Sequence, residues 1–326
     1  MKLADPFLHW FWKTQISVLR ACPPLCGVVS SLSIGAENSP GIWVKTLLQA
    51  AVRMPRVIYL HWRNRREHRA VLSRVSVIVT TRCTLNCDKC MAHIPDLADH
   101  RDMPFSALHA DMQALFACVD QVYATILTGG EAFLHPELDK ILRLCAESGK
   151  AGSISVQTNG TVIPDGIVLT ALKDAKASVK ISRYAPALQP DAERLKAILK
   201  AYGIPYTHAS GTFWRDTGKL GHPQKGSEKR RFGVCTVPLC WSYVDGKLHL
   251  CAQTALLLER GLLSGCEEDY IDMRTACPGA FRKKLRELLA RRTVSACSYC
   301  LGDTYKTPKI PVAVQREPGL ATPPSP

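Results

Sequence analysis

The stretch Val75-Ser-Val-Ile-Val-Thr80, followed closely by Cys83-Thr-Leu-Asn-Cys87-Asp-Lys-Cys90, decides how the chain is built. Valine and isoleucine dominate 75–80, which predicts a buried strand that leads into a loop with the cysteine spacing C-x3-C-x2-C. Three thiolates this close are able to bind three irons of a 4Fe-4S cube and leave the fourth iron without a protein ligand. The alternatives are a zinc site completed by His93 and a disulfide.

Length and composition set the class of protein. With 326 residues, of which 46% are hydrophobic, the chain is long enough for one full core and a smaller annex. No apolar run reaches the ~18 residues that a membrane span needs, and no secretory signal with a clear cleavage site begins the chain. We therefore expect a cytoplasmic protein without a transmembrane segment, whose fourteen cysteines are reduced and include metal ligands.

The charge is strongly basic. A net charge of +14 favours anionic partners such as phosphorylated sugars, nucleic acid or a membrane surface. Much of this charge precedes the first cysteine loop, in Arg53, Arg56, Arg63, Arg65, Arg66, Arg69 and Arg74. A solvated basic helix face is the alternative to a functional role. We predict a basic, helical N-terminal extension over residues 1–74, with its helix broken or kinked at Pro55.

Strands and helices alternate through the middle of the chain. The apolar patterns predict strands at 75–80, 121–127, 153–157, 178–182 and 205–209. Helices are predicted between them at 106–118, 137–147, 166–174 and 192–202. Such alternation is typical of a parallel sheet with right-handed crossovers, in which chemistry collects at the carboxyl ends of the strands.

Polar motifs stand at the ends of three of these strands. The second strand ends in Gly129-Gly130-Glu131, where two glycines allow a close backbone approach and a carboxylate projects beside the cysteine loop. The third ends in Thr158-Asn159-Gly160 and the fourth in Ser182-Arg183-Tyr184. A plain βα turn also explains Gly-Gly-Glu, and Asn-Gly is a common turn signal.

The cysteine spacing, with Gly-Gly-Glu one helix and one strand later, resembles the radical S-adenosylmethionine (SAM) superfamily. The resemblance implies that Cys83, Cys87 and Cys90 hold a 4Fe-4S cluster whose open iron binds SAM. Reductive cleavage of SAM then gives a 5′-deoxyadenosyl radical that abstracts a substrate hydrogen. The resemblance also implies cofactor contacts, with the SAM amino group held by Gly129, Gly130 and Glu131, its pocket lined by Asn159 or Thr158, and its carboxylate reached by Ser182.

Two positions depart from the pattern of that family, and no catalytic residue is assigned. Arg183 stands where an acidic residue is expected, and it is a candidate partner of the SAM carboxylate or of an anionic substrate. Lys89 stands where an aromatic residue is often found, which affects the usual adenine contact but not the cluster.

A second set of cysteines follows a predicted hairpin. Residues 242–250 contain an Asp-Gly turn between apolar arms, which brings Cys235 and Cys251 together. This spacing, with the later pair Cys297 and Cys300, resembles the auxiliary-cluster module of the SPASM/twitch group, in its shorter twitch form. The resemblance implies that these four cysteines hold a second 4Fe-4S cluster. Cys240 competes with Cys235 for this place, and a four-cysteine zinc site is the alternative.

These observations predict an α/β fold, a partial (β/α)6 TIM-like barrel with a small C-terminal twitch-like α/β annex. The expected domains are a radical SAM core at 75–232, an auxiliary module at 233–305 and a disordered, proline-rich tail at 306–326. We expect a radical SAM enzyme that oxidises or modifies a small polar metabolite or sugar, with an electron donor such as flavodoxin or ferredoxin. The alternatives are a peptide-maturing radical SAM enzyme and a non-enzymatic, metal-stabilised protein that binds nucleic acid.

Overall fold

A computed structural model describes residues 13–317, apart from residue 15 and the segments 26–41, 209–212 and 219–221. A nine-stranded sheet forms its centre, and eight of its strands follow one another in the order β10-β9-β8-β2-β3-β4-β5-β6. The predicted strands are β2 (Val75–Thr80), β3 (Gln121–Gly129), β4 (Ala151–Thr158), β5 (Ser178–Ile181) and β6 (Tyr206–His208). Each pairs in parallel with the next, which confirms the predicted α/β class and the partial, unclosed barrel.

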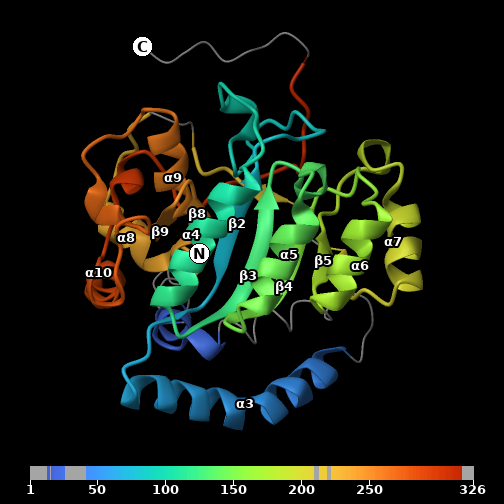
Figure 1. The fold of residues 1–326 in the computed structure, drawn as a ribbon. Coiled ribbons are helices and arrows are strands. Elements are labelled where there is room, and N and C mark those ends of the chain that lie inside the picture. Colours follow the sequence, from blue (N-terminus) through green and yellow to red (C-terminus); the bar gives the residue numbers. More distant parts are fainter. Residues whose placement is uncertain (1–12, 15, 26–41, 209–212, 219–221, 318–326) are drawn as a thin grey trace.

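Helices connect these strands and cover one face of the sheet (Figure 1). They are α4 (Phe105–Cys118), α5 (Leu138–Glu147), α6 (Gly166–Asp174) and α7 (Ala192–Ala201). Alternation along β2 explains the two faces, because Val75, Val77 and Val79 are buried in the main core. Ser76 and Ile78, on the opposite face, line a pocket.

The predicted hairpin forms, but it extends the main sheet. Strands β8 (Trp241–Val244) and β9 (Lys247–His249) are antiparallel, and the turn between them places Asp245 and Gly246 at positive φ (45° and 71°). Asp-Gly is a favoured sequence for such a turn. Strand β8 pairs in parallel with β2, on the side away from β3, so the hairpin stands beside the strand that leads into the first cysteine loop.

Three α-helices and one further strand of the main sheet complete the part of the chain around this hairpin. They are α8 (Glu228–Val234), α9 (Ala252–Glu259), α10 (Pro278–Ala290) and β10 (Tyr270–Asp272), which pairs with β9. Figure 1 shows these helices grouped beside β8 and β9. None of the described helices is long and apolar enough to cross a membrane.

The N-terminal extension contains one long helix, α3 (Ile42–Arg66). Pro55 lies inside it, and the helix continues through this position instead of ending there. The short strand β1 (Val71–Leu72) then pairs with the first residues of β3, so α3 lies at the amino-terminal end of the strands (Figure 1).

Part of the C-terminal segment for which disorder was expected is ordered. Strand β11 (Lys309–Ile310) pairs with β7 (Trp214–Arg215), and the chain then runs along the first cysteine loop as far as Arg316. Composition suggested disorder because few residues there can build a core, but backbone and side-chain hydrogen bonds hold this stretch in place. Residues 318–326 lie outside the described part of the chain.

Candidate active site

A pocket of about 350 Å³ opens at the carboxyl ends of the parallel strands. Its size is in the range of small-molecule and cofactor sites. Nearly all residues predicted for the first site line it, namely Cys83, Cys87, Cys90, Gly129, Gly130, Thr158, Asn159 and Ser182. Residues for which no cofactor contact was predicted complete the walls, among them Tyr184, Trp214, Ser242 and Glu259.

The two glycines allow β3 to reach the cysteine loop. The Gly130 N–H donates to the Thr80 carbonyl (2.9 Å) and the Glu131 N–H donates to the Arg82 carbonyl (2.8 Å). A Cβ atom at position 130 would lie 2.7 Å from the Arg82 carbonyl carbon and 2.9 Å from the Cβ of Cys83. Since the obstructing atoms are mostly backbone, only glycine permits this approach.

Glu131 is fully buried behind the pocket and does not line it. Its Oε1 accepts from the Phe133 N–H (3.0 Å), and its Oε2 accepts from the Thr158 hydroxyl (2.9 Å) and the Asn159 N–H (2.7 Å). Burial raises the pKa of this carboxyl to about 7, against the effect of the three hydrogen bonds. In this structure the carboxylate joins the ends of β3 and β4, and its contact with the SAM amino group stays a prediction.

Asn159 faces the first cysteine. Its Nδ2 lies 3.6 Å from the Cys83 sulfur and donates to the Thr84 hydroxyl (2.9 Å). The buried Gln189 holds the neighbouring loop, because its Nε2 donates to the carbonyl oxygens of Ser182 (2.7 Å) and Asn159 and its Oε1 accepts from the Tyr184 N–H (2.8 Å). No sequence motif pointed to Gln189, since it lies on the loop after β5 without a neighbouring polar pattern.

The three thiols lie in a low-dielectric environment. Burial is the largest cause that raises the pKa of Cys83, Cys90 and Cys87, the last to about 11. Binding iron must therefore displace the thiol protons, as in any thiolate site. Within the described residues, no group of three or more His, Cys, Asp or Glu side chains is arranged to hold a single metal ion.

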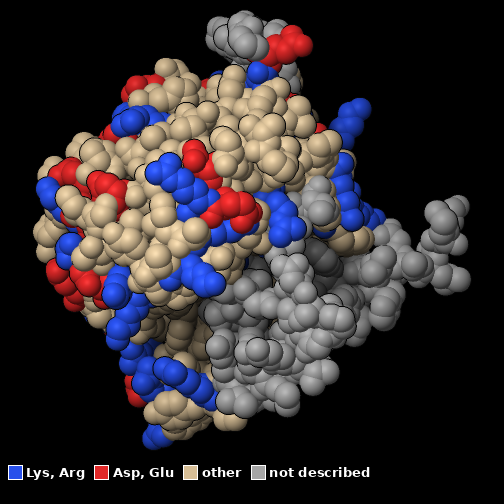
Figure 2. All heavy atoms as spheres, turned by 90° about the vertical axis from the view of Figure 1, so that its right-hand side faces the viewer, with Lys and Arg blue, Asp and Glu red and all other residues tan. Residues whose placement is uncertain are grey.

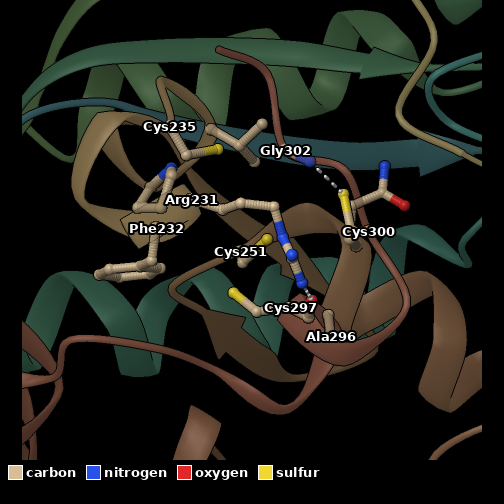
Figure 3. A pocket seen from close by; sticks show the side chains of 11 residues that line it. Arg231, Phe232, Cys235, Cys251, Ala296, Cys297, Cys300 and Gly302 are labelled. Carbon is tan, nitrogen blue, oxygen red and sulfur yellow. Dashed lines mark hydrogen bonds between the residues drawn. The ribbon is translucent and has the colours of Figure 1, made fainter. Parts of the chain in front are cut away.

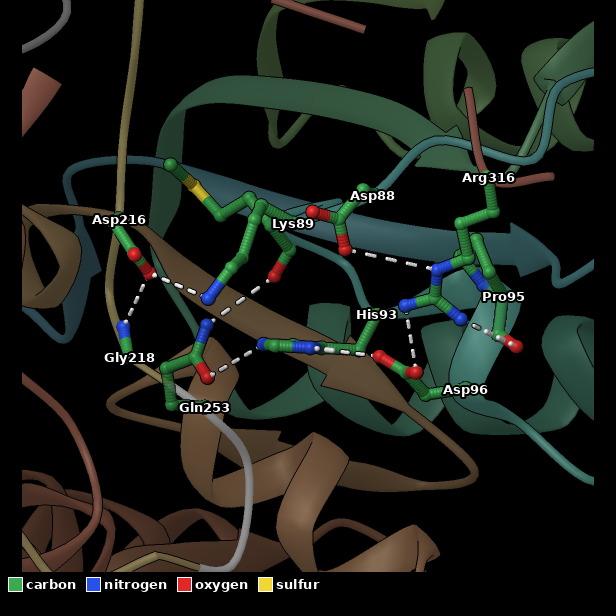
Figure 4. A network of polar contacts seen from close by, with 10 residues as sticks. Asp88, Lys89, His93, Pro95, Asp96, Asp216, Gly218, Gln253 and Arg316 are labelled. Carbon is green, nitrogen blue, oxygen red and sulfur yellow. Dashed lines mark hydrogen bonds and ion pairs between the residues drawn. The ribbon is translucent and has the colours of Figure 1, made fainter. Parts of the chain in front are cut away.

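His93, the alternative fourth ligand for zinc, is engaged in another network (Figure 4). Its Nδ1 lies 3.2 Å from the Asp96 carboxylate and its Nε2 lies 3.2 Å from the Gln253 Oε1. Both ring nitrogens thus have partners away from the cysteines. This arrangement favours a structural role for His93 over that of a metal ligand.

The C-terminal segment forms a strap over the cysteine loop, which we define as residues 313–316. Gln315 accepts from the Asn86 N–H (2.9 Å) through its Oε1, and its Nε2 lies 3.1 Å from the Cys87 sulfur. Arg316 pairs with Asp96 (2.8 Å) and lies 3.8 Å from the Asp88 carboxylate (Figure 4). The strap thus contacts the middle of the loop and the segment that follows it, and it donates a hydrogen bond to one of the thiols.

The second set of cysteines surrounds a separate pocket. Cys235, Cys251, Cys297 and Cys300 all line it, and Figure 3 shows their sulfur atoms around the side chain of Arg231. Cys240 does not line this pocket, and its sulfur lies 3.1 Å from the Ser76 hydroxyl instead. Between the two competing cysteines, the geometry therefore favours Cys235.

Burial also affects the pKa of the thiols in this second set. It raises the pKa of all four thiols, to about 12 for Cys235 and about 11 for Cys300. Two arginines lie close by, since Arg231 donates to the Cys297 carbonyl (2.8 Å) and Arg20 donates to the carbonyl of Phe232 (2.9 Å). A four-thiolate site carries negative charge, which these guanidinium groups offset.

The first turn of α9 connects the two sites. Cys251 and Gln253 line the second pocket, whereas Ala252 lines the first. Gln253 also donates to the Met91 carbonyl (3.2 Å), next to the first cysteine loop. The two cysteine sets therefore share a wall that is only a few residues thick.

Comparison with known proteins agrees with this geometry. Residues 77–208 match the family model described as the radical SAM superfamily. No curated protein matches the chain.

Several solved structures show local similarity. The anSMEcpe structure with bound AdoMet and Cp18Cys peptide has 19% identity over 43% of this chain and 42% of its own, with a TM-score of 0.35. Streptococcus suis SuiB bound to S-adenosylmethionine has 15% identity over 52% of this chain and 39% of its own, with a TM-score of 0.36. BtrN in complex with AdoMet and 2-DOIA has 17% identity over 70% of this chain and 92% of its own, with a TM-score of 0.43. The chain thus covers less than two thirds of the length of the first two.

Proposed function

We propose that the pocket at the carboxyl ends of β2–β5 binds SAM at a 4Fe-4S cluster held by Cys83, Cys87 and Cys90. The supporting observation is that three thiols from one short loop line a single pocket with the ends of three neighbouring strands. The donor set fits a cube with one open iron, since three soft thiolate ligands are present and His93 is engaged elsewhere. When bound, the cluster supplies the electron that cleaves SAM to methionine and a 5′-deoxyadenosyl radical, which abstracts a substrate hydrogen.

The residues of the chain position the cofactor. The backbone of Gly129 and Gly130 borders the pocket beside the cysteine loop, where it would hold the methionine moiety of SAM. Ser182 offers a hydroxyl for the SAM carboxylate and Asn159 an amide beside Cys83. The buried Glu131 fixes the loop between these groups, and its charge favours the SAM amino group.

The substrate that this pocket suits best is a small polar metabolite or sugar. The inner faces of the strands place hydroxyl and amide groups toward the pocket, in Ser76, Gln157 and Ser242. Trp214 closes one side, packed edge-on against Tyr184 with 5.9 Å between ring centroids. Such polar side chains match the hydroxyl groups of a sugar-like alcohol.

We infer a second, fully ligated 4Fe-4S cluster at Cys235, Cys251, Cys297 and Cys300, in a twitch-like module. Four cysteines around one pocket complete such a cluster without a substrate ligand. Its place next to the first pocket, across the first turn of α9, suits electron transfer from the substrate radical. The reaction would then be a net oxidation, in a cytoplasmic enzyme that receives its first electron from a flavodoxin or ferredoxin.

The test is SAM cleavage by the full chain, purified and reconstituted with iron and sulfide without oxygen. With dithionite as reductant, we expect methionine and 5′-deoxyadenosine in equal amounts, measured by liquid chromatography and mass spectrometry. Protein that contains the cluster but forms no 5′-deoxyadenosine would overturn the proposal. Bound zinc without acid-labile sulfide would overturn it as well.

The strap predicts a measurable change in the cluster at Cys83, Cys87 and Cys90. A hydrogen bond to a cluster thiolate stabilises the more negative, reduced state and so raises its reduction potential. Replacing Gln315 by leucine removes the donor to Cys87, and we expect the potential to fall by about 20–60 mV. Potentials are measured by redox titration with electron paramagnetic resonance detection.

The matched variant for this prediction is Gln315→Glu, which keeps an oxygen for the Asn86 N–H but places an acceptor against the Cys87 sulfur. We expect the reduction potential to be highest in the wild type, lower in Gln315→Leu and lowest in Gln315→Glu. Equal potentials in the three proteins, with the cluster intact, would show that the strap does not influence the cluster.

A further inference from the structure

Helix α3 presents apolar side chains to solvent. Ile58, Tyr59 and Trp62 are 62%, 55% and 52% exposed, respectively. With Pro55, which is also exposed, they occupy positions i, i+3, i+4 and i+7, which form one stripe along a helix. A helix that packs on a globular core normally turns such a stripe inward. Here the outer stripe needs another explanation.

The inner face of α3 is already attached to the protein. Val57 and Asn64 are buried, and the Asn64 amide donates to the Tyr123 hydroxyl of β3 (2.6 Å). The exposed stripe is therefore not the face through which α3 packs on the described part of the fold. It lies on the side of a firmly held helix that faces away from the sheet.

The charge of α3 has one sign. The helix contains six basic residues and no acidic residue, the basic ones being Lys45, Arg53, Arg56, Arg63, Arg65 and Arg66. Two arginines lie over the exposed rings, with Arg63 5.9 Å from the Tyr59 centroid and Arg66 5.0 Å from the Trp62 centroid. Figure 2 shows basic side chains gathered at the lower end of the molecule, where α3 lies. Elsewhere on that face, acidic and basic side chains are interspersed.

We propose that the outer face of α3, formed by Ile58, Tyr59, Trp62, Arg65 and Arg66, binds an anionic lipid surface. Aromatic and aliphatic side chains enter the boundary between headgroups and acyl chains, while neighbouring arginines contact lipid phosphates. Tryptophan and tyrosine are the residues that favour this boundary. A nucleic acid would use the arginines but would leave Ile58 and much of the aromatic surface uncovered, so charge and apolar area together favour a membrane.

The location of α3 leaves the active site accessible. The helix lies at the amino-terminal ends of the strands, whereas the pocket with the cysteines opens at their carboxyl ends (Figure 1). A protein bound through α3 would therefore keep its pocket directed away from the lipid. This inference is independent of the proposed reaction.

The experiment is co-sedimentation of the full chain with vesicles of phosphatidylcholine alone or mixed with an equal amount of phosphatidylglycerol. We expect binding to the mixed vesicles and little to phosphatidylcholine. Each basic residue near an anionic surface contributes about fivefold in affinity, so R65E/R66E should weaken binding at least about tenfold. Y59S/W62S should also weaken it at least about tenfold, because the apolar anchors are lost.

Matched controls change similar residues on another exposed helix. K283E/R286E alters the charge by the same amount on α10, and Leu289→Ser removes an apolar side chain that is 54% exposed. Neither should alter vesicle binding, and circular dichroism checks that every variant is folded. The proposal is overturned if the two α3 variants bind vesicles as well as the controls do, or if the wild-type protein does not bind anionic vesicles. Tight, salt-dependent binding of duplex DNA that Y59S/W62S retains, with no vesicle binding, would assign α3 to nucleic acid instead.

Discussion

Replacing Cys83, Cys87 and Cys90 together by alanine is expected to reduce 5′-deoxyadenosine formation to background. The reconstituted wild-type chain should contain about eight irons and eight acid-labile sulfides if both cysteine sets hold a cubane cluster. The triple variant should retain about four of each, because the second set lies in its own pocket with its own four thiols. Iron and sulfide analysis, together with product detection, measures both quantities on the same sample.

The reciprocal variant replaces Cys235, Cys251, Cys297 and Cys300. We expect it to contain about four irons and still to cleave SAM, because the first pocket keeps its three thiols. Cys145→Ala is the matched control, since that thiol is fully buried in the main core and lines neither pocket, and its loss should leave the iron content unchanged. If the quadruple variant lost no iron, the second cluster would be excluded while the first remained.

Much of the central fold was predictable because local pattern and long-range topology agree there. Apolar strands such as 75–80 and amphipathic helices such as α6 ended within a few residues of their predicted limits. Parallel neighbours then placed Gly129, Asn159 and Ser182 at one edge of the sheet, where they line one pocket with the cysteines. Adjacent strands with single helix crossovers leave few other arrangements.

What the sequence did not reveal depends on contacts between distant segments. The pairing of β8 with β2 joins residues more than a hundred positions apart, and a hairpin pattern alone does not say which sheet it enters. The strap is similar, because proline-rich composition predicts disorder although Gln315 and Arg316 find partners on the first loop. Glu131 was predicted to project a carboxylate beside the cysteine loop, but its carboxylate is buried behind the strand ends, where it accepts hydrogen bonds from Phe133, Thr158 and Asn159.

The outer stripe of α3 was visible in the sequence but ambiguous. Apolar residues at helical spacing normally mark a core face, and Ile58 and Trp62 fitted that interpretation as well as any other. Only the observed burial of Val57 and Asn64 shows which side of the helix packs against the sheet. Continuation of the helix through Pro55 also depended on context, since proline in a helix interior is usually disruptive.

Gly130→Ala is expected to lower the free energy of unfolding by about 3 kcal/mol, near the upper end of the cost of overpacking. The added methyl group would overlap the Arg82 carbonyl and lie 2.9 Å from the Cβ of Cys83. The Arg82 backbone cannot rotate away from the new methyl group as a flexible side chain could. The cysteine loop and the end of β3 must therefore move apart. Urea denaturation of the cluster-free protein measures the change.

Gly166→Ala is the matched control, because the nearest atom to a Cβ there is the Tyr202 hydroxyl at 3.9 Å and the residue begins α6. Its free energy of unfolding should change by less than about 1 kcal/mol. In the reconstituted proteins, Gly130→Ala should lose the first cluster and SAM cleavage while it keeps about four irons at the second set. A Gly130→Ala protein as stable as the control, with full iron content and normal SAM cleavage, would show that the close approach of Gly130 to the cysteine loop is not required. Loss of all iron would instead show that the two cysteine sets depend on one another, as their shared wall at α9 permits.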